Sequence, residues 1–413
     1  MNNVPLLLGC IGDDFTGSSD AASFLVNEGI PTILCNGIPK DPLLVKGCVA
    51  VVIALKTRSI EPKIAKNQTL EAIDYLESAG AKQFYIKYCS TFDSTPKGNI
   101  GTTVDAAIER LKVPYTILAP GLPVNKRIIK DGILYVDGVL LSESHMRNHP
   151  LNPMWASEIG TLMKDQGKYK TIILKENNLY KKELEKIYEE YDQPFYIVPD
   201  HKNERDGKRI DRLFGSLKLL TGSSGILKHL GERYKKEYKL SIDSIFDNKT
   251  IGNGLALSGS CSKATKDQVL EYSKQGPVLF LDYKKLKTAE QTFETVWSFI
   301  KKHKNPLVYS CNLDEDNNLA EESDCLLLED FFSKLASKAI SVGYKSLIVA
   351  GGETSGAVIQ KLAFDAFYIG KSIAPGVPIL QPIVNKDIRI VLKSGNFGCT
   401  NFFAKSFADI LNI

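Results

Sequence analysis

Charged and polar side chains follow three strand-like segments in the first half of the chain. They are Asp13 and Asp14 after residues 4–11, Arg58 after residues 48–55, and Lys87, Ser90 and Asp93 around the end of residues 83–88. Ligands of open parallel sheets bind beyond the carboxyl ends of the strands, so we expect these side chains to share one rim. Cationic groups suit a carboxylate and acidic groups suit hydroxyls, so the set predicts a site for an anionic, polyhydroxylated small molecule.

Each of these segments also has a purely structural interpretation. Asp13 and Asp14 precede Thr-Gly and can cap a helix, Arg58 can be a solvated loop residue, and residues 90–96 can form a turn. Taken singly, these interpretations are the commoner ones. Their coincidence at three strand ends favours a binding site.

The second half of the chain carries three glycine-containing turns. They are residues 257–262 (LSGSCS), 351–356 (GGETSG) and 393–398 (KSGNFG). Small residues at a strand-to-helix turn let backbone N–H groups approach phosphates, and the helix N-terminus adds a favourable field. One such turn can merely satisfy tight-turn geometry. Three such turns in one half of the chain predict nucleotide binding.

Two familiar nucleotide motifs are missing from the sequence. Gly370-Lys371-Ser372 has the ending of a P-loop, but Asp365 stands where that motif requires its first glycine. No G-x-G-x-x-G occurs either. The pattern therefore supports neither a P-loop NTPase nor a Rossmann dehydrogenase.

Composition narrows the class of protein further. The 413 residues are 43% hydrophobic and 24% charged, which fits two or three globular domains. A net charge of +4 is too small to predict binding to nucleic acid or to an anionic membrane. The eight cysteines have no paired spacing, the N-terminus has no basic region, and no apolar stretch is long enough to span a membrane. We expect a cytoplasmic protein.

The segments that would position these residues alternate between strand and helix patterns. Strands are expected at 4–11, 32–35, 48–55, 83–88, 115–119, 254–258, 278–281, 306–310, 346–350 and 388–393. Runs that are apolar on both faces and separated by helices predict parallel sheets covered on both sides. A highly charged stretch, 183–249, precedes a new strand-turn-helix pattern, so we place a domain boundary near 245–252. We expect an α/β protein of two Rossmann-like three-layer domains, with mainly parallel sheets and an active-site cleft between them.

Eight segments in a fixed order carry a resemblance to a known family. They are IGDDFTGSSDAASFL, YIKYCSTFDSTPKGNIG, LSESHMRNHPLNPM, LTGSSG, SGSCS, GGETSG, APGVP and LKSGNFG, and the resemblance as a whole spans residues 4–403. The chain resembles the two-domain four-carbon acid sugar kinases. Within that family, CSTFDSTPKGNIG, LLSES and HPLNPM are similar to the branch that acts on 3-oxo-tetronates. Kinases of D-threonate or D-erythronate resemble the chain less and stay the alternative.

The resemblance implies a reaction and two domain roles. ATP, with Mg²⁺, would donate its γ-phosphoryl group to the terminal hydroxyl of a four-carbon sugar acid. Residues 1–248 would bind the sugar acid and residues 249–413 would bind ATP. No nucleic-acid or membrane partner is implied, and a homo-oligomer stays open. A non-catalytic sugar-acid sensor is the competing class of function.

The resemblance also implies roles for individual residues. Asp13, Arg58, Lys87 and Ser90 would bind the substrate, and Asp14 or Asp93 would receive the proton of the attacking hydroxyl. ATP contacts are expected at Ser258, Gly351, Gly352, Glu353, Thr354, Ser355, Gly356, Gly395 and Gly398. The Mg²⁺ ligands are not identified, and Glu353 could equally be a structural acid at a helix start. Cys399-Thr400-Asn401 replaces a segment in which the family usually has an acidic residue.

Overall fold

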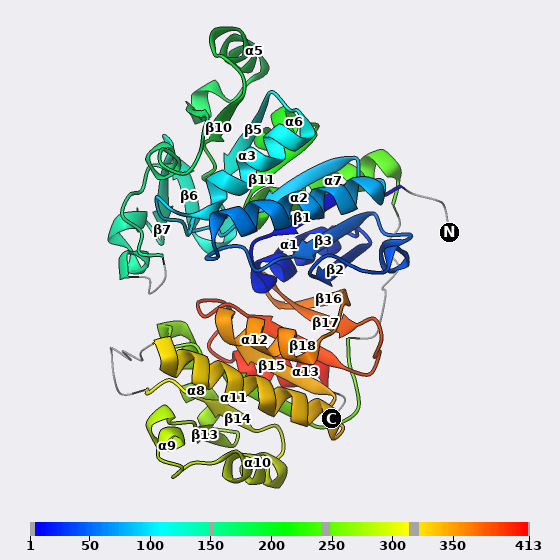
Figure 1. The fold of residues 1–413 in the computed structure, drawn as a ribbon, viewed down its shortest axis with the longest axis vertical. Helices are drawn as coiled ribbons and strands as arrows, with labels where there is room; N and C mark the ends of the chain where they lie inside the picture. The colour runs from blue at the N-terminus through cyan, green and yellow to red at the C-terminus, as the bar shows by residue number, and fades with distance from the viewer. Residues whose placement is uncertain (1–4, 149–151, 241–247, 314–321, 412–413) are drawn as a thin grey trace. The chain divides into compact units, whose positions relative to one another are not determined.

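The computed structural model describes residues 5–148, 152–240, 248–313 and 322–411. The chain forms two compact units, residues 1–243 and 244–413, and each is built of helices and mainly parallel strands (Figure 1). The predicted α/β class is therefore confirmed. The predicted boundary at 248 adjoins residues 241–247, which lie outside the described residues.

The sheet of the N-terminal unit has the strand order β2-β3-β1-β4-β11-β5-β10-β9, and its strands run parallel. The strands are β1 (Leu8–Gly12), β2 (Thr32–Asn36), β3 (Ala50–Ala54), β4 (Gln83–Lys87), β5 (Tyr115–Ala119), β9 (Lys170–Leu174), β10 (Phe195–Pro199) and β11 (Leu219–Gly222). The central strands are buried along their whole length. Burial on both faces is the reason that they read as continuous apolar runs rather than as alternating patterns.

Helices cover both faces of this sheet. From β1 the chain passes through α1 (Phe15–Asn27) to β2 in one direction, and from β3 it passes through α2 (Pro62–Ser78) to β4 in the other. Because such crossovers are right-handed, α1 and α2 lie on opposite faces. In agreement, α1 contacts α7 (Leu227–Tyr238), whereas α2 contacts α3 (Asn99–Leu111). The other helices are α4 (Ile159–Met163), α5 (Lys181–Glu190) and α6 (Glu204–Phe214).

A small antiparallel sheet follows β5 and was not predicted. It consists of β6 (Arg127–Lys130), β7 (Ile133–Val136) and β8 (Val139–Leu140). Ile129 of β6 bonds through its backbone to His201, just after β10, which fastens the small sheet beside the main one. Short 3-10 helices occupy residues 42–45, 123–125, 141–143, 145–148, 176–178 and 224–226.

The sheet of the C-terminal unit has the order β13-β14-β12-β15-β18-β17-β16. The strands are β12 (Gly254–Ser258), β13 (Val278–Phe280), β14 (Leu307–Tyr309), β15 (Ser346–Ala350), β16 (Ala366–Ala374), β17 (Val377–Pro382) and β18 (Arg389–Lys393). The first five in the sheet are parallel, and β17 runs antiparallel to β16 and β18. Gly370, Lys371 and Ser372 lie inside β16, so they form no phosphate-binding loop.

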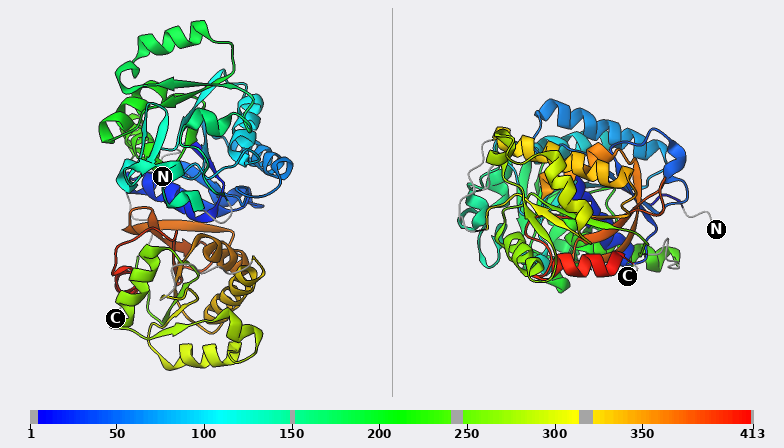
Figure 2. Two further views of the ribbon diagram at one scale, coloured as in Figure 1. Left: turned by 90° about the vertical axis from the view of Figure 1, so that its left-hand side faces the viewer. Right: turned by 90° about the horizontal axis from the view of Figure 1, so that it is seen from below.

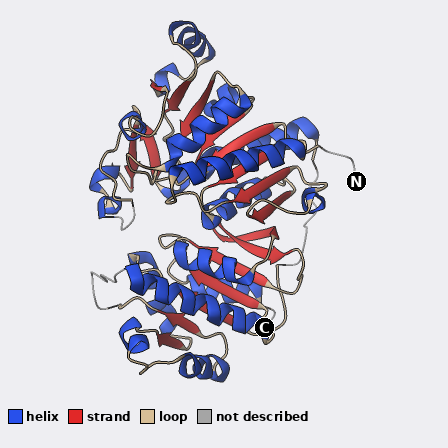
Figure 3. Cartoon of the chain, in the orientation of Figure 1, coloured by secondary structure: helices blue, strands red, loops and turns tan. Residues whose placement is uncertain are grey.

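Helices also cover this second sheet, as the colouring in Figure 3 shows. One group is α8 (Lys263–Ser273) with α13 (Phe402–Ile410), and another is α11 (Glu322–Ser341) with α12 (Gly352–Leu362). The remaining helices are α9 (Tyr283–Lys287) and α10 (Phe293–Lys302). Phe402, Phe403 and Phe407 of α13 are buried against β15 and β18, and the long α11 is seen beside the sheet in both views of Figure 2.

Within the part of the chain that the structure describes, none of the helices combines the length and the apolar character that a membrane crossing requires.

Candidate active site

Three strand ends of the N-terminal unit are tied together around Asp13. The Asp13 backbone N–H donates to the Lys87 carbonyl at the end of β4 (3.1 Å), and its own carbonyl accepts from the Thr57 N–H after β3 (3.0 Å). Asn99, the first residue of α3, donates from Nδ2 to the carbonyls of Thr57 (2.7 Å) and Ile60 (2.8 Å). The loops after β1, β3 and β4 therefore meet, which brings the predicted rim residues into contact.

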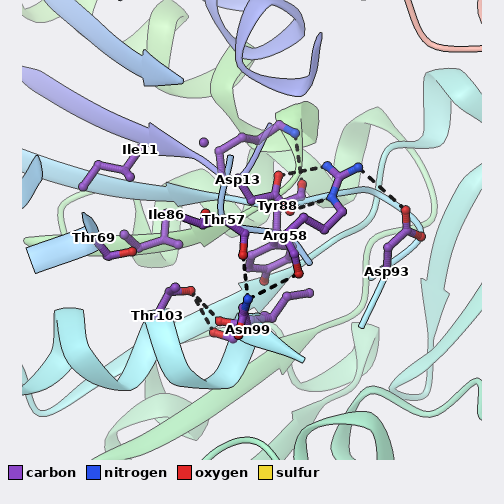
Figure 4. Close-up of a pocket in the computed structure, with 13 residues that line it drawn as sticks. Ile11, Asp13, Thr57, Arg58, Thr69, Ile86, Tyr88, Asp93, Asn99 and Thr103 are labelled. Carbon is purple, nitrogen blue, oxygen red and sulfur yellow. Dashed lines mark hydrogen bonds and ion pairs between the residues drawn. The ribbon is translucent and has the colours of Figure 1, made fainter. Parts of the chain in front are cut away.

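Arg58 lies at the centre of this rim and is surrounded by carboxylates (Figure 4). Its Nε and Nη2 donate to the two oxygens of Asp13, each at 2.9 Å. Nη2 is also 2.9 Å from Oδ1 of Asp14, and Nη1 is 3.9 Å from Oδ2 of Asp93. The two-pronged edge of the guanidinium is thus occupied by the protein itself. The Nη1 edge, which faces Asp93, is the part left for a ligand.

Asp14 is the N-cap of α1. Its Oδ1 accepts the Gly17 N–H (3.0 Å) and its Oδ2 accepts the Thr16 hydroxyl (2.7 Å), so both oxygens have partners within the first turn. Burial opposes ionisation of this carboxyl, but Arg58, Lys87 and the two hydrogen bonds outweigh it and lower the Asp14 pKa. A Cβ at Gly17 would lie 2.3 Å from Oδ1 of Asp14, so only glycine fits there. The structural interpretation of Asp14 as a cap is therefore correct.

Asp93 has a different environment. Its side chain is 6% exposed, Oδ1 accepts the Thr91 hydroxyl (2.6 Å), and Oδ2 faces Arg58 at the longer distance given above. Asp93 also lines a pocket, together with Asp13, Arg58, Lys87 and Asn99. Ser90 lies in the same loop and is half-buried, but it is not among the residues that line this pocket. Of the two carboxylates proposed as bases, Asp93 is the one that lines this pocket.

Lys87 brings a second positive charge to this site and is 3% exposed. Its ammonium donates to the Tyr88 carbonyl (3.0 Å) and would lie 3.1 Å from a Cβ at Gly17. Arg58 and Lys87 therefore give the pocket two cations, and both are held by the protein before any ligand arrives.

Asp20 is a buried acid that interacts electrostatically with Lys87 and Asp14 of this site, and the sequence analysis missed it. It is 4% exposed, Oδ2 accepts the Ser224 hydroxyl, and Oδ1 is buried without a hydrogen-bond partner. Burial, against the opposing charge of Lys87, raises the Asp20 pKa to about 6. A signal was present in the sequence, because Ser18, Ser19, Asp20 and Ser23 make an unusually polar stretch for a helix covered by the sheet.

The glycine turns of the C-terminal unit lie side by side. They follow β12, β15 and β18, which are neighbours in that order and run parallel. The Gly259 N–H donates to Ala350 O (3.0 Å), and the Gly351 N–H donates to Lys393 O (2.9 Å). The structure therefore brings the three predicted turns to one edge of the sheet, where the N-termini of α8 and α12 also lie.

Close packing explains why these turns contain glycine. A Cβ at Gly259 would lie 2.1 Å from Oγ1 of Thr354, and one at Gly395 would lie 2.4 Å from Oγ of Ser260. Gly351 has φ +119°, a backbone conformation that other residues rarely adopt. Gly352 is exposed, and a Cβ there would have no neighbour within 4 Å. The space above Gly352 is thus open to a ligand.

The other predicted ATP contacts differ in their exposure. Ser258 and Ser355 are buried, and neither side-chain oxygen has a hydrogen-bond partner, whereas Glu353 is exposed in the first turn of α12. Thr354 is buried between the first two turns, and Gly356 and Gly398 are half-buried. Gly398, with φ +88°, ends the third turn.

The described residues contain one group with metal-ligand spacing, and it lies outside these turns. It consists of Glu204, His229 and Glu232 in the N-terminal unit. The Lys228 ammonium is 2.5 Å from Glu204 and 4.0 Å from Glu232, so a cation already neutralises the two acids. We assign no metal to it. Since Mg²⁺ commonly binds through substrate phosphates and one or two carboxylates, Glu353 is the acid in these turns that could reach it.

Comparison with known proteins places the chain in a family. A family model described as a sugar-binding N-terminal domain matches residues 8–230, and one described as a nucleotide-binding C-terminal domain matches residues 255–403. The 3-oxo-tetronate kinase of Brucella melitensis is 39% identical, with 96% of this chain and 94% of the relative covered. The 3-oxo-tetronate kinase of Actinobacillus succinogenes is 40% identical, with 96% and 98% covered.

Two solved structures share the fold over nearly the whole chain. One from Salmonella typhimurium has a TM-score of 0.84 at 35% identity and covers 97% of this chain and 98% of its own. One from Haemophilus influenzae has a TM-score of 0.76 at 38% identity, with 97% and 99% covered. The chain therefore belongs to the two-domain four-carbon acid sugar kinase family. Within that family, the relatives from Brucella melitensis, Actinobacillus succinogenes and Haemophilus influenzae are named 3-oxo-tetronate kinases.

Proposed function

We propose that this chain is an ATP-dependent kinase that phosphorylates the terminal C4 hydroxyl of a 3-oxo-tetronate, giving the 4-phosphate and ADP. The observation that carries the proposal is the likeness, over nearly the whole chain, to relatives named for this activity. Support comes from the chemistry of the two rims, one rich in carboxylates with the buried Lys87 and the half-buried Arg58, and the other made of glycine turns.

The N-terminal unit would bind the sugar acid. Lys87 and the Nη1 edge of Arg58 supply positive charge for the substrate carboxylate, and Asp13 holds Arg58 in place through its paired hydrogen bonds. Ser90 lies in the same loop but does not line the pocket, so its proposed contact with a substrate hydroxyl rests on the family resemblance alone. Asp93 would orient the C4 hydroxyl and receive its proton as the hydroxyl attacks. Asp14, whose oxygens are both engaged, would act chiefly by fixing α1 and Arg58.

The C-terminal unit would bind ATP, which supplies the phosphoryl group. Ser258 and the turns 351–356 and 395–398 would surround the phosphates, because backbone N–H groups at strand-to-helix turns favour anions. Phosphoryl transfer depends mainly on alignment and on stabilising charge, so rigid turns and fixed cations suit it better than a covalent intermediate. Mg²⁺ would bind through the phosphates of ATP, and Glu353 is the candidate protein ligand.

A coupled ADP-release assay tests the proposal. The substrates are both 3-oxo-tetronate enantiomers, D-threonate, D-erythronate and L-threonate, each with ATP and Mg²⁺ and each without ATP. We expect the highest kcat/KM for one of the 3-oxo acids. A preference for D-threonate or D-erythronate would refute the substrate assignment while keeping the kinase assignment. Tight sugar-acid binding with no ADP release from any acid would favour a sensor.

A further inference from the structure

The side chain of Lys393 is buried at the end of β18, where the third glycine turn begins, and the proposed function gives it no role. The residue is 1% exposed. Its ammonium donates to Oγ1 of Thr265 (2.7 Å), to the Gly395 carbonyl (2.8 Å) and to the Ser394 carbonyl (3.2 Å). These three acceptors are all uncharged, and the Phe402 ring centroid lies 5.6 Å from Nζ. Burying the ammonium removes most of its hydration. This costs free energy, because none of its three acceptors carries a compensating negative charge.

Three side chains donate hydrogen bonds to the Gly395 carbonyl. It accepts hydrogen bonds from Lys393 Nζ, from the Ser262 hydroxyl (2.6 Å) and from the Thr265 hydroxyl (2.7 Å). Ser262 is the N-cap of α8, and Thr265 lies in its first turn. A carbonyl held by three donors has one orientation, because rotating the peptide would break all three bonds.

The rest of the turn is held in the same way. Gln268, one turn further along α8, donates from Nε2 to the carbonyls of Phe397 (3.0 Å) and Gly398 (3.2 Å). Three carbonyls of the 395–398 turn therefore point to α8 and Lys393. In a trans peptide the N–H is directed opposite to the C=O, so the N–H groups of Gly398 and Cys399 point away from α8. Such an array of N–H groups is what an anion requires.

We propose that Lys393 is a positioning residue of the nucleotide site, which holds the 395–398 turn through the Gly395 carbonyl so that the backbone N–H groups of Gly398 and Cys399 face the phosphates of ATP. The inference rests on the proposed function, since it takes ATP as the ligand. The charge of Lys393 adds a second effect, because a buried cation behind the turn strengthens the attraction of the turn for an anion. Burial lowers the Lys393 pKa to about 7, and a bound triphosphate would favour its protonated form.

The test compares Lys393→Met, Thr265→Val and Lys345→Met in the full-length chain. Methionine keeps the length of the side chain without the charge, and valine keeps the shape of threonine without its hydroxyl. Lys345 is the matched control, because it pairs with Asp387 at the surface of the same unit. Calorimetry gives the Kd of ADP, steady-state assays give separate KM values for ATP and the sugar acid, and thermal unfolding reports folding.

We expect Lys393→Met to weaken ADP binding and to raise the ATP KM by about 10- to 100-fold, with the sugar-acid KM changed less than about two-fold. Thr265→Val should weaken ADP binding by about 3- to 10-fold, and Lys345→Met should leave it unchanged. A folded Lys393→Met variant with wild-type ADP affinity, or with equal increases in both KM values, would overturn the inference. If that variant does not fold, unchanged ADP affinity in Thr265→Val overturns it. ADP binding that depends on Lys393, in a chain that phosphorylates no four-carbon acid, would refute the proposed function and keep the inference.

Discussion

The Asp13 carboxylate binds the Arg58 guanidinium through two parallel hydrogen bonds of 2.9 Å, from Nε to Oδ2 and from Nη2 to Oδ1. This geometry is specific to arginine, since a lysine ammonium cannot offer two fixed donors in one plane. It also fixes which edge of the guanidinium faces the pocket. The pair therefore orients Arg58 for the substrate, in addition to compensating its charge.

Arg58→Lys should separate orientation from charge. We expect the KM for the sugar acid to rise by about 10-fold or more, because lysine keeps the charge and loses the paired bonds, while the KM for ATP stays within about two-fold. Arg110→Lys is the control, since Arg110 also contacts two carboxylates, Asp74 and Glu77, but at the exposed surface. An unchanged sugar-acid KM in Arg58→Lys would contradict the role of Arg58 in the pocket.

Asp93→Asn and Asp14→Asn should differ in their effect on kcat. Asp93→Asn removes the proposed base, so we expect kcat to fall by about 10²- to 10⁴-fold with folding preserved. Asn is as good an N-cap as Asp, so Asp14→Asn should keep α1 and lower kcat much less. The measurements are kcat at saturating substrates and thermal unfolding of both variants. A larger loss of kcat in Asp14→Asn than in Asp93→Asn would reverse the assignment.

The stability of the N-terminal unit should depend on pH through Asp20. The folded-state pKa is about 6, above the unfolded value of ~3.9, so the stabilising contribution is complete below pH ~4 and is lost as pH rises through about 6. Asp20→Asn stays neutral at every pH. We therefore expect the free energy of unfolding of Asp20→Asn, relative to wild type, to rise by up to ~3 kcal/mol between pH 4 and pH 7. Urea unfolding at several pH values measures this difference, and parallel curves for the two proteins would contradict it.

Gly351→Ala and Gly352→Ala should separate backbone strain from contact with the ligand. Gly351 has φ +119°, so alanine there should lower the free energy of unfolding by about 1–3 kcal/mol. A Cβ at Gly352 meets no protein atom within 4 Å, so Gly352→Ala should leave stability within about 0.5 kcal/mol of wild type. If phosphate approaches this turn, Gly352→Ala should still raise the ATP KM. An unaltered ATP KM in that variant would mean that the phosphates lie elsewhere.

The buried parallel strands were the part of the fold that the sequence predicted best. Residues 115–119 form β5 with the predicted bounds, because the segment is apolar and its neighbours have helical spacing. The antiparallel pair β16 and β17 was missed. Residues 366–382 mix glycine, lysine and three prolines into a short apolar pattern that has no clear period.

The candidate site was predicted in part. Position after a strand was a sufficient signal for Asp13, Arg58 and Asp93, because parallel strands end at one edge. The paired hydrogen bonds of Arg58 join it to Asp13, which is far away in the sequence, so the sequence alone did not show which carboxylate binds it. The sequence also left open whether Asp14 caps α1. Lys393 ended a predicted strand, yet its role depends on α8, more than a hundred residues earlier. The roles of the site residues, the domain boundary and the cleft between the units stay predictions.

The hydrogen bonds that join the three glycine turns limit how the turns can move relative to one another. Backbone hydrogen bonds join the first turn to the second and the second to the third. Side chains of α8 donate hydrogen bonds to carbonyls of the third turn. Displacing one turn alone would break bonds to its neighbour, so we expect the three to move as one rigid body. If amide hydrogens in all three turns exchange slowly even without nucleotide, then the phosphate-binding turns are already ordered before the ligand binds.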